Sequence, residues 1–300
     1  MPGSSSSSRE RIIGNILVRG RNRGPSPLPE RAARLWRSLG AAFVILVFVP
    51  PLLLLVSGSL TEPGLPPSPT PQLVPDPVST AGYERALDLG GLLRASLNSV
   101  LVAVVAVPLS VLVASLAGFA LARLAPRTTA VVVAASLVAL MVPPTALLVP
   151  RFAIFRFLGL TDTLVPLIAP ALLGTSPLYV LVYYLAFRAL PADLYDACQV
   201  EDLSPVRTWW QVALPLVRPV TAGLTALTFI LTWSNFLDPL IYVYDRDLFT
   251  LPLALRSLSL LDPTNFPVFL AGAVIATLPA LGVFVLAQRR FLHDHSDPRE

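Results

Sequence analysis

The sequence has 300 residues, of which 54% are hydrophobic and only 13% are charged. Soluble domains carry about 25% charged residues, and the mean hydropathy of +0.70 is strongly apolar, so the composition predicts a membrane protein and excludes an ordinary soluble domain. The net charge is +4, but the arginines flank hydrophobic segments, where they indicate membrane topology rather than nucleic-acid binding. The single cysteine excludes an intrachain disulfide and a CxxC metal site.

The first part of the chain contains a polar tail, one apolar segment and a proline-rich connector. Residues 1–39 hold eight arginines against two glutamates, and we expect them to form a disordered cytoplasmic tail. Residues 40–60 are uncharged and long enough for a membrane span, which needs about 20 helical residues. A cleaved signal peptide is not expected, because this apolar run starts late and no small-residue cleavage site follows it. Residues 61–91 are rich in proline, serine and threonine, which predicts an extended outer loop.

Residues 92–292 form the predicted permeation core, which holds five further uncharged segments. The expected spans two to six are residues 95–122, 128–150, 163–187, 219–237 and 267–288. Prolines interrupt span three at Pro143 and Pro144, and span four contains Pro166, Pro170 and Pro177. Helix breaks at membrane depth are tolerated where neighbouring helices or a water-filled cavity satisfy the freed backbone groups. The proline pattern therefore predicts a helical bundle that lines a path.

Arginines at the ends of these segments predict the orientation of the chain. Arg123 and Arg127 follow span two, and Arg188 follows span four. The positive-inside rule assigns these ends to the cytoplasm. The prediction is therefore an all-α membrane protein with six transmembrane helices, both termini inside, and a cytoplasmic loop, residues 190–218, between spans four and five. The tail 293–300 contains two histidines, which we interpret as part of a solvated terminus rather than a metal site.

Residues 190–218 are the longest polar stretch of the core. Pro191 suits the first turn of a helix and Asp193 favours a helix N-terminus, so a short helix to about Val200 is predicted. Its expected docking face is Leu194, Ala197 and Cys198, and its expected wet face is Asp193, Asp196 and Gln199. Ser204 followed by Pro205 predicts a second helix through the two tryptophans toward Leu214. By itself this pattern also fits a plain surface helix pair with solvated acids.

This stretch resembles the EAA loop of ABC-importer permeases, which carries the coupling helix of the membrane subunit. The matching positions are Asp196, Ala197 and Cys198 for E-A-A, Glu201 and Asp202 for the following D-G, and Leu214 and Pro215 for the final L-P. The resemblance implies that these seven residues couple the chain to an ATPase. Cys198 replaces an alanine, and Asp202 replaces the glycine of the turn. Aspartate tolerates a left-handed backbone, so we expect the turn to survive with some strain.

The resemblance extends over about residues 90–292 and favours the sugar-importer branch, in which the smaller maltose-type permease is found. The segments that carry it are residues 96–99, 141–163, 232–243, 249–255 and 276–291. It implies a carbohydrate substrate, with polyamines, phosphate esters and oxyanions as alternatives within the ABC class. It also implies a multi-pass protein in the inner or plasma membrane of a prokaryote.

The resemblance implies a transport subunit rather than an enzyme, together with a set of partners. These are two ATP-binding cassette subunits, a second homologous permease in a heterodimer, and an extracytoplasmic solute-binding protein, all acting at a lipid bilayer. The chain has no Walker-type G-x-x-x-x-G-K-[ST] motif and no lysine. We therefore expect no cofactor here, with ATP and magnesium bound by the partner ATPase.

Trp233 and Asn235 are the candidate substrate-path residues. An aromatic ring and an amide suit the ring faces and hydroxyl groups of sugars, although interhelical hydrogen bonding is the commoner role of polar side chains in spans.

Two other functional classes fit the sequence less well. An intramembrane protease is disfavoured, because the long uncharged segments contain no aspartate, glutamate or histidine. An ion-coupled secondary transporter would use buried carboxylates and would have no use for an EAA-like loop.

Overall fold

The computed structural model describes residues 30–65, 73–88, 91–174, 176–260 and 263–294. The chain divides into two compact units, Met1–Leu53 and Leu54–Glu300. All regular elements in the described ranges are helical, which confirms the predicted all-α class. In those ranges, four helices are long and apolar enough to cross a membrane, and the number rises to six if each of two sharply bent helix pairs is one span.

The described part of the first unit belongs to α2 (Glu30–Ser59). This helix begins ten residues before the predicted start of span one, so residues 30–39 are helical and not part of a disordered tail. Arginine, alanine and leucine are frequent there, and these residues favour helix. Residues 1–29, the rest of the predicted tail, lie outside the described range. Phe43, Leu46 and Phe48 of α2 are exposed.

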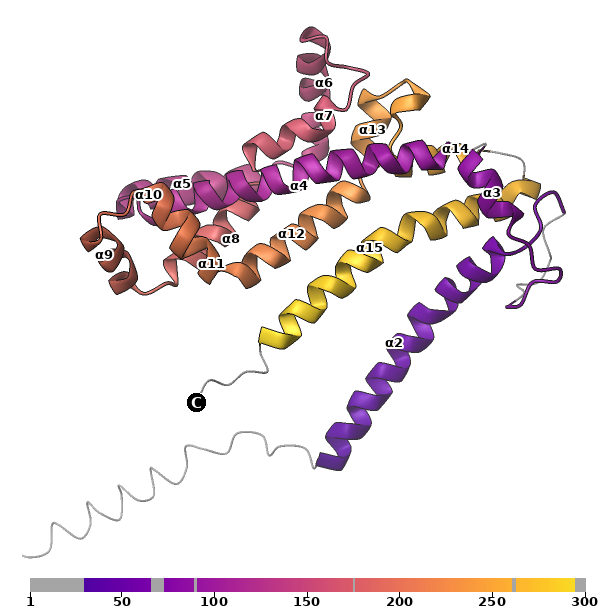
Figure 1. Ribbon diagram of the computed structural model, residues 1–300, viewed down its shortest axis with the longest axis horizontal. Helices are drawn as coiled ribbons and strands as arrows, with labels where there is room; N and C mark the ends of the chain where they lie inside the picture. Colours follow the sequence, from indigo (N-terminus) through magenta and orange to yellow (C-terminus); the bar gives the residue numbers. More distant parts are fainter. Residues whose placement is uncertain (1–29, 66–72, 89–90, 175, 261–262, 295–300) are drawn as a thin grey trace, which may run out of the picture. The chain divides into compact units, whose positions relative to one another are not determined.

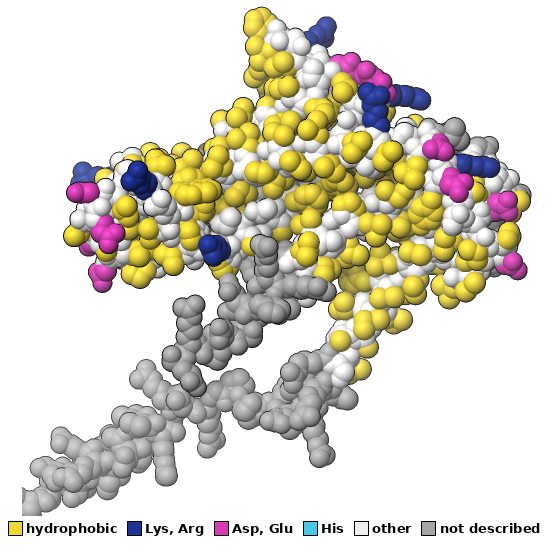
Figure 2. All heavy atoms as spheres, viewed as in Figure 1, with side chains coloured by type: hydrophobic (Ala, Val, Ile, Leu, Met, Phe, Trp, Pro, Cys, Tyr) yellow, Lys and Arg dark blue, Asp and Glu magenta, His cyan; other side chains and the backbone are white. Residues whose placement is uncertain are grey.

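The second unit is organised around α4 (Leu92–Ala122), which has 31 residues and packs along α8 (Pro177–Arg188) and α12 (Arg218–Trp233). Helix α12 also packs against α15 (Phe266–Asp294), as Figure 1 shows. On the face seen in Figure 2, charged side chains gather toward the ends of this unit and hydrophobic side chains cover much of the surface between them. This distribution is typical of a bundle that crosses an apolar layer.

Helices α4 and α8 approach each other closely at Gly118. A Cβ atom at this position would lie 2.5 Å from the Cβ of Tyr183 and 2.8 Å from the backbone nitrogen of Tyr184. Tyr183 and Phe187 of α8 are fully buried and stack with ring centroids 5.8 Å apart. The absence of a side chain at Gly118 therefore allows the two helices to approach closely, as small residues do in membrane bundles.

The predicted spans three and four are interrupted near the prolines, as the sequence predicted. Helix α5 (Pro126–Leu140) is followed by η1 (Pro144–Leu147) and α6 (Leu148–Phe157), and the chain bends by 87° at the break. The chain stays helical to Phe157, beyond the predicted end of span three at Pro150. Span four consists of α7 (Val165–Ile168), η2 (Ala169–Leu173) and α8. Pro166 and Pro177 lie in the first turns of α7 and α8, where a missing N–H costs nothing.

Residues 61–91, predicted to be an outer loop, and the segment between predicted spans five and six contain helices that the sequence did not predict. They are α3 (Ala81–Asp88), α13 (Leu237–Tyr242), η4 (Arg246–Leu248), α14 (Leu251–Leu258) and η5 (Pro263–Asn265). Helix α12 ends at Trp233, not at Leu237 as predicted. Leu251 and Leu258 of α14 are buried in one apolar cluster with Leu92 and Val268. The charges in residues 238–266 concealed this amphipathic helix, which packs as part of the core.

Asp162 ties two of the outer segments together. Its carboxylate accepts hydrogen bonds from the backbone N–H groups of Tyr244, at 2.9 Å, and Asp245, at 2.8 Å. Its own N–H donates to the carbonyl of Tyr242 at 2.7 Å, and its φ is 59°. The two backbone donors hold the pKa of the Asp162 carboxyl below its usual value. The charged form of Asp162 therefore fastens the turn before α7 to the segment after α13.

We expect Gly118→Ala to destabilise the protein by about 1–3 kcal/mol, because the added methyl group would overpack the contact of α4 with α8. Gly282→Ala is the matched control, since a Cβ there meets nothing within 4 Å, and alanine should stabilise that helix by up to about 1 kcal/mol. Thermal unfolding of both variants in detergent tests this. Equal stability of the two variants would contradict the close-packing argument.

Candidate functional site

The candidate coupling site, residues 190–218, is a helix pair joined by a turn. Helix α9 (Ala192–Val200) is followed by α10 (Pro205–Arg207), the π-helical segment η3 (Thr208–Ala213) and α11 (Leu214–Leu216). This confirms the predicted helix, turn and helix. The second helix then turns through 85° into α12. In Figure 1 this site lies at one end of α4, and α3 and α14 lie at the other.

Backbone hydrogen bonds form the turn between the two helices. The N–H of Leu203 donates to the carbonyl of Cys198 at 3.0 Å, and that of Asp202 donates to Gln199 at 3.1 Å. Asp202 has a φ of 51°, so it adopts the left-handed conformation predicted from its place in the motif. The hydroxyl of Ser204 accepts from the N–H of Arg207 at 3.4 Å, which confirms the predicted helix cap.

Tyr195 holds α9 against the bundle. The guanidinium carbon of Arg123 lies 5.2 Å from the centre of the Tyr195 ring and 5.5 Å from that of Phe119. The Tyr195 hydroxyl donates to the carbonyl of Phe187 at 3.0 Å. Burial raises the pKa of the Tyr195 phenol, and the positive charge of Arg123 opposes that shift. The ends of α4 and α8 are therefore joined to the candidate coupling site through one aromatic side chain.

The docking face predicted from the sequence is partly wrong. Cys198 is buried and Leu194 is half-buried, as expected, but Ala197 is exposed. The pattern missed Tyr195, which a helical wheel places beside Cys198 at the i+3 position. Its role depends on Arg123, which is distant in the sequence, so the local pattern alone could not reveal it.

The opposite face of the candidate coupling site is exposed and contains both acidic and apolar side chains. Asp193, Asp196 and Gln199 are exposed, as predicted, and Glu201 is exposed as well. Val200, Val206 and Trp210 are also exposed, by 86%, 65% and 58%. Large apolar side chains left uncovered on a charged loop indicate a protein contact surface.

The last part of the motif lies at the junction with α12. Leu214 and Pro215 are half-buried, and Ala213 beside them is fully buried. These residues therefore belong to the corner between the second helix of the candidate coupling site and the bundle, whereas the acidic residues belong to the exposed face of the site.

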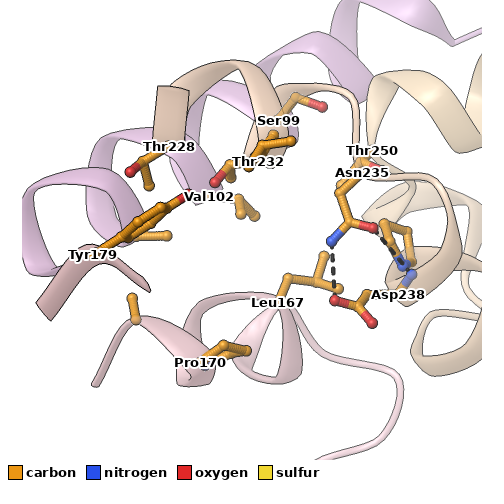
Figure 3. A pocket seen from close by; sticks show the side chains of 14 residues that line it. Ser99, Val102, Leu167, Pro170, Tyr179, Thr228, Thr232, Asn235, Asp238 and Thr250 are labelled. Atoms are coloured by element: carbon orange, nitrogen blue, oxygen red, sulfur yellow. Dashed lines mark hydrogen bonds between the residues drawn. The ribbon is translucent and has the colours of Figure 1, made fainter. Parts of the chain in front are cut away.

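A central polar cavity of about 150 Å3 lies between α4, η2, α8, α12 and α13 (Figure 3). Its polar lining residues are Ser99, Tyr179, Thr228, Thr232, Asn235, Asp238 and Thr250. In Figure 3, Tyr179 and Thr228 lie at one end of the cavity, and Asn235 and Asp238 lie at the other. The cavity thus combines hydroxyls, an amide, a carboxylate and an aromatic ring.

Asn235 and Asp238 form a fixed pair at one end of the cavity. The Asn235 amide nitrogen donates to the Asp238 carboxylate at 3.0 Å, and the Asp238 N–H donates to the Asn235 side-chain oxygen at 3.2 Å. The other oxygen of Asp238 lies 3.6 Å from the Arg151 guanidinium, and both side chains are mostly buried, with exposed fractions of 17% and 27%. Asp238 is therefore oriented and neutralised from two directions. In the part of the chain described, no three His, Cys, Asp or Glu side chains gather as potential metal ligands.

Thr250 supplies an unsatisfied hydroxyl to the cavity. It precedes α14 in the N-cap position, but its side chain makes no capping hydrogen bond. The N–H of Leu251, the first residue of α14, donates to the hydroxyl of Ser99 at 2.8 Å. The Thr250 hydroxyl is buried without a hydrogen-bond partner, which costs about 1–3 kcal/mol unless a bound molecule or water supplies one.

The structure brings only one of the two candidate substrate-path residues to the cavity. Asn235 lines it, whereas Trp233 is buried in the apolar cluster of α14 and α15. The indole N–H of Trp233 donates to the carbonyl of Ala276 at 2.9 Å, and its ring stacks on Phe229 with centroids 5.6 Å apart. The sequence identified Trp233 and Asn235 as candidates near the predicted end of span five. It could not predict that their side chains point in different directions.

Comparison with known proteins agrees with this architecture. Residues 80–291 match the family described as the binding-protein-dependent transport system inner membrane component. The chain belongs to this family. A lactose transport system permease protein, LacG, of Rhizobium radiobacter is 32% identical over 195 residues, which cover 65% of this chain and 71% of that protein. An arabinooligosaccharides transport system permease protein, AraQ, of Halalkalibacterium halodurans is also 32% identical over 195 residues, covering 65% and 69%.

The chain also shares its fold with a solved structure. It is that of a bacterial ABC transporter involved in the import of the acidic polysaccharide alginate. The two chains align with a TM-score of 0.68 at 19% sequence identity, over 97% of this chain and 100% of the other. The similarity therefore extends to the whole permease fold.

Asp202→Gly should stabilise the protein by about 1 kcal/mol, because glycine adopts a positive φ without the strain of a side chain. Glu201→Gly is the matched control. Its φ is −83°, so glycine there only increases the entropy of the unfolded chain and should destabilise. Thermal unfolding of the two variants would give shifts of opposite sign. A loss of stability in Asp202→Gly would contradict the strain argument and would mean that the carboxylate makes a stabilising contact of its own.

Proposed function

We propose that this chain is the membrane subunit of an ATP-driven importer that takes up a carbohydrate. The observation that carries the proposal is the candidate coupling site. It keeps the EAA-like order of residues, is anchored to α4 by Tyr195, and leaves Asp196 and Glu201 exposed. In a member of this transport family, such a loop is suited to receive force from an ATPase and pass it to the spans.

The proposed topology has six transmembrane helices and both termini in the cytoplasm. Counting each bent helix pair as one span gives six candidates. Arg123, Arg127 and Arg188 flank the end of the bundle that carries the candidate coupling site, which favours a cytoplasmic position for that end. The segment containing α13 and α14 would then face outward.

The proposed partners follow from the two ends of the bundle. Two ATP-binding cassette subunits would bind ATP and magnesium, and one of them would receive the acidic and apolar face that includes Asp196, Val200 and Trp210. A second, homologous permease would complete the pathway as a heterodimer. An extracytoplasmic solute-binding protein would deliver substrate to the outer end.

A carbohydrate substrate is supported by the relatives and by the chemistry of the cavity. The relatives described above are named for lactose and arabinooligosaccharides, and the solved neighbour imports alginate. Hydroxyl, amide and carboxylate groups can exchange hydrogen bonds with sugar hydroxyls, and the Tyr179 ring offers an apolar face. A cavity of 150 Å3 has the liquid volume of roughly five water molecules. It would hold only part of an oligosaccharide, so the partner permease would contribute the rest of the path.

The proposed mechanism is alternating access by rigid-body motion. ATP-driven closure of the two ATPases would move the coupling helices as levers. Because Tyr195 fastens α9 to Arg123 at the end of α4, the motion would reach the longest helix of the bundle directly. Rocking of the spans would then open the cavity to one side of the membrane at a time.

Asp196→Arg tests the coupling interface. If Asp196 meets a basic residue of the ATPase, arginine replaces an attraction with a like-charge clash of several kcal/mol. The variant should insert and fold normally, yet lose the ATPase subunit in co-purification and lose uptake. As a contrasting variant, Ala213→Glu should impair folding itself, because it introduces an unpaired charge at a fully buried position.

Retention of the ATPase and of wild-type uptake in Asp196→Arg would refute the coupling assignment. Uptake that continues when vanadate inhibits the ATPase would instead favour an ion-coupled transporter.

Thr250→Val tests the cavity as part of the substrate path. Valine keeps the shape of threonine and removes an unpaired buried hydroxyl, so stability should stay the same or rise. If the hydroxyl binds substrate, the KM for sugar uptake should rise by roughly fivefold, the effect of one neutral hydrogen bond of about 1 kcal/mol.

Thr277→Val is the control for this substitution. Its hydroxyl bonds within α15 to the carbonyl of Ala273 and is exposed, so uptake should be unchanged. An unchanged KM in Thr250→Val would remove this side chain from the substrate path.

A further inference from the structure

A second cavity lies at the end of the bundle that carries the candidate coupling site. It has a volume of about 360 Å3 and is enclosed by the C-terminal end of α4, the start of α5 and the last turns of α8. Its walls are mostly apolar, from Leu124, Ala130 and Val133, and a single charged residue, Arg188, lines it. We call it the inner cavity.

Arg188 is held at this cavity without an acidic partner. Its guanidinium donates to the hydroxyl of Tyr184, which also lines the cavity, and lies 5.7 Å from the centre of that ring. The ion pairs of the described residues do not include Arg188 or the nearby, exposed Arg127. The aromatic ring therefore positions a positive charge that the fold leaves unneutralised.

The start of α5 adds further attraction for an anion. Ala125 cannot cap this helix and Pro126 lacks an N–H. Helix geometry leaves the N–H groups of Arg127 and Thr128 without intrahelical acceptors, and a helix N-terminus favours negative charge. The hydroxyl of Thr129 is already used, since it donates to the carbonyls of Leu121 and Leu124 at 3.3 Å.

We propose that the inner cavity binds the phosphate headgroup of an anionic phospholipid, with an acyl chain along its apolar wall. An isolated arginine beside an apolar wall matches a molecule with a negative head and a hydrocarbon tail. Val131, Leu137 and Val138 on α5 are exposed, so the apolar surface continues along that helix. Basic cavities between helices at the cytoplasmic side of a membrane are suited to anionic headgroups.

The proposal rests on the proposed topology, which puts this end of the bundle at the inner leaflet. Its consequence is that lipid composition acts on the helices that anchor the candidate coupling site, because Arg188 directly follows Phe187, the residue whose carbonyl accepts from Tyr195. Bound phospholipid would stabilise the junction of α4, α5 and α8.

The test uses the full chain purified in detergent with its ATPase and permease partners, after removal of endogenous lipid. Phosphatidylglycerol and phosphatidylcholine with the same acyl chains are added separately. Thermal unfolding and native mass spectrometry then measure stabilisation and the number of lipids retained. We expect phosphatidylglycerol to raise the unfolding temperature and to be retained, and phosphatidylcholine to do neither.

Arg188→Gln should abolish the difference between the two lipids. Arg218→Gln is the matched control, because Arg218 is an exposed arginine at the start of α12 that does not line the inner cavity; this variant should keep the difference. If Arg188→Gln does not fold, Ala130→Phe provides a second variant. It keeps the charge, fills the apolar wall and should also abolish lipid retention.

Three results would overturn the proposal. They are equal effects of the two lipids, retention of the lipid preference in Arg188→Gln, and an equal, Arg188-dependent stabilisation by glycerol phosphate without lipid, which would indicate a site for free phosphate. None of these would affect co-purification of the ATPase with the wild-type chain, so failure here is distinguishable from failure of the proposed function.

Discussion

The close approach of α4 and α8 at Gly118 is the contact on which the rest of the second unit depends. It brings the stacked Tyr183 and Phe187 against α4, and it sets the distance between the two helices at the end that carries the candidate coupling site. At that end, the carbonyl of Phe187 accepts a hydrogen bond from the Tyr195 hydroxyl, and the guanidinium of Arg123 lies over the Tyr195 ring. A change in the spacing of these two helices would thus alter the surface on which α9 packs.

The demand for backbone hydrogen bonds shapes the middle and outer parts of the bundle. Prolines break spans three and four, and the freed groups must find partners inside the protein. The short helical segments after α12 have the same demand: Ser99 of α4 accepts from the N–H of Leu251 at the start of α14, and Asp162 accepts from the N–H groups of residues 244 and 245. The polar side chains of the central cavity lie where the continuous helices are replaced by these short segments. The irregular backbone of the short segments and the polar side chains that line the central cavity therefore occur in the same part of the bundle.

The sequence predicted those features that depend on local pattern. Proline positions predicted the break at Pro143, and the serine before Pro205 predicted a helix start. The positive φ of Asp202 followed from its position in the motif. Features that depend on partners distant in the sequence were missed. The N–H of Leu251, next to Thr250, donates to Ser99, which is distant in the sequence, and the Thr250 hydroxyl is buried without a partner. Likewise, the direction of Trp233 is decided by the carbonyl of Ala276. Helix α14 was missed because it has only eight residues and lies in a segment with charges on both sides of it.

The π-helical segment η3 determines how the second helix of the candidate coupling site is aligned with the bundle. A π turn closes hydrogen bonds between residues i and i+5 and inserts an extra residue relative to the α-helix. The side chains after Ala213 are therefore rotated relative to those before Thr208, compared with a continuous α-helical wheel. Trp209 and Ala213 are buried while Trp210 stays exposed, and the phase shift changes the angular register between this segment and α12. A loop of equal length but purely α-helical winding would present a different set of side chains on its exposed face.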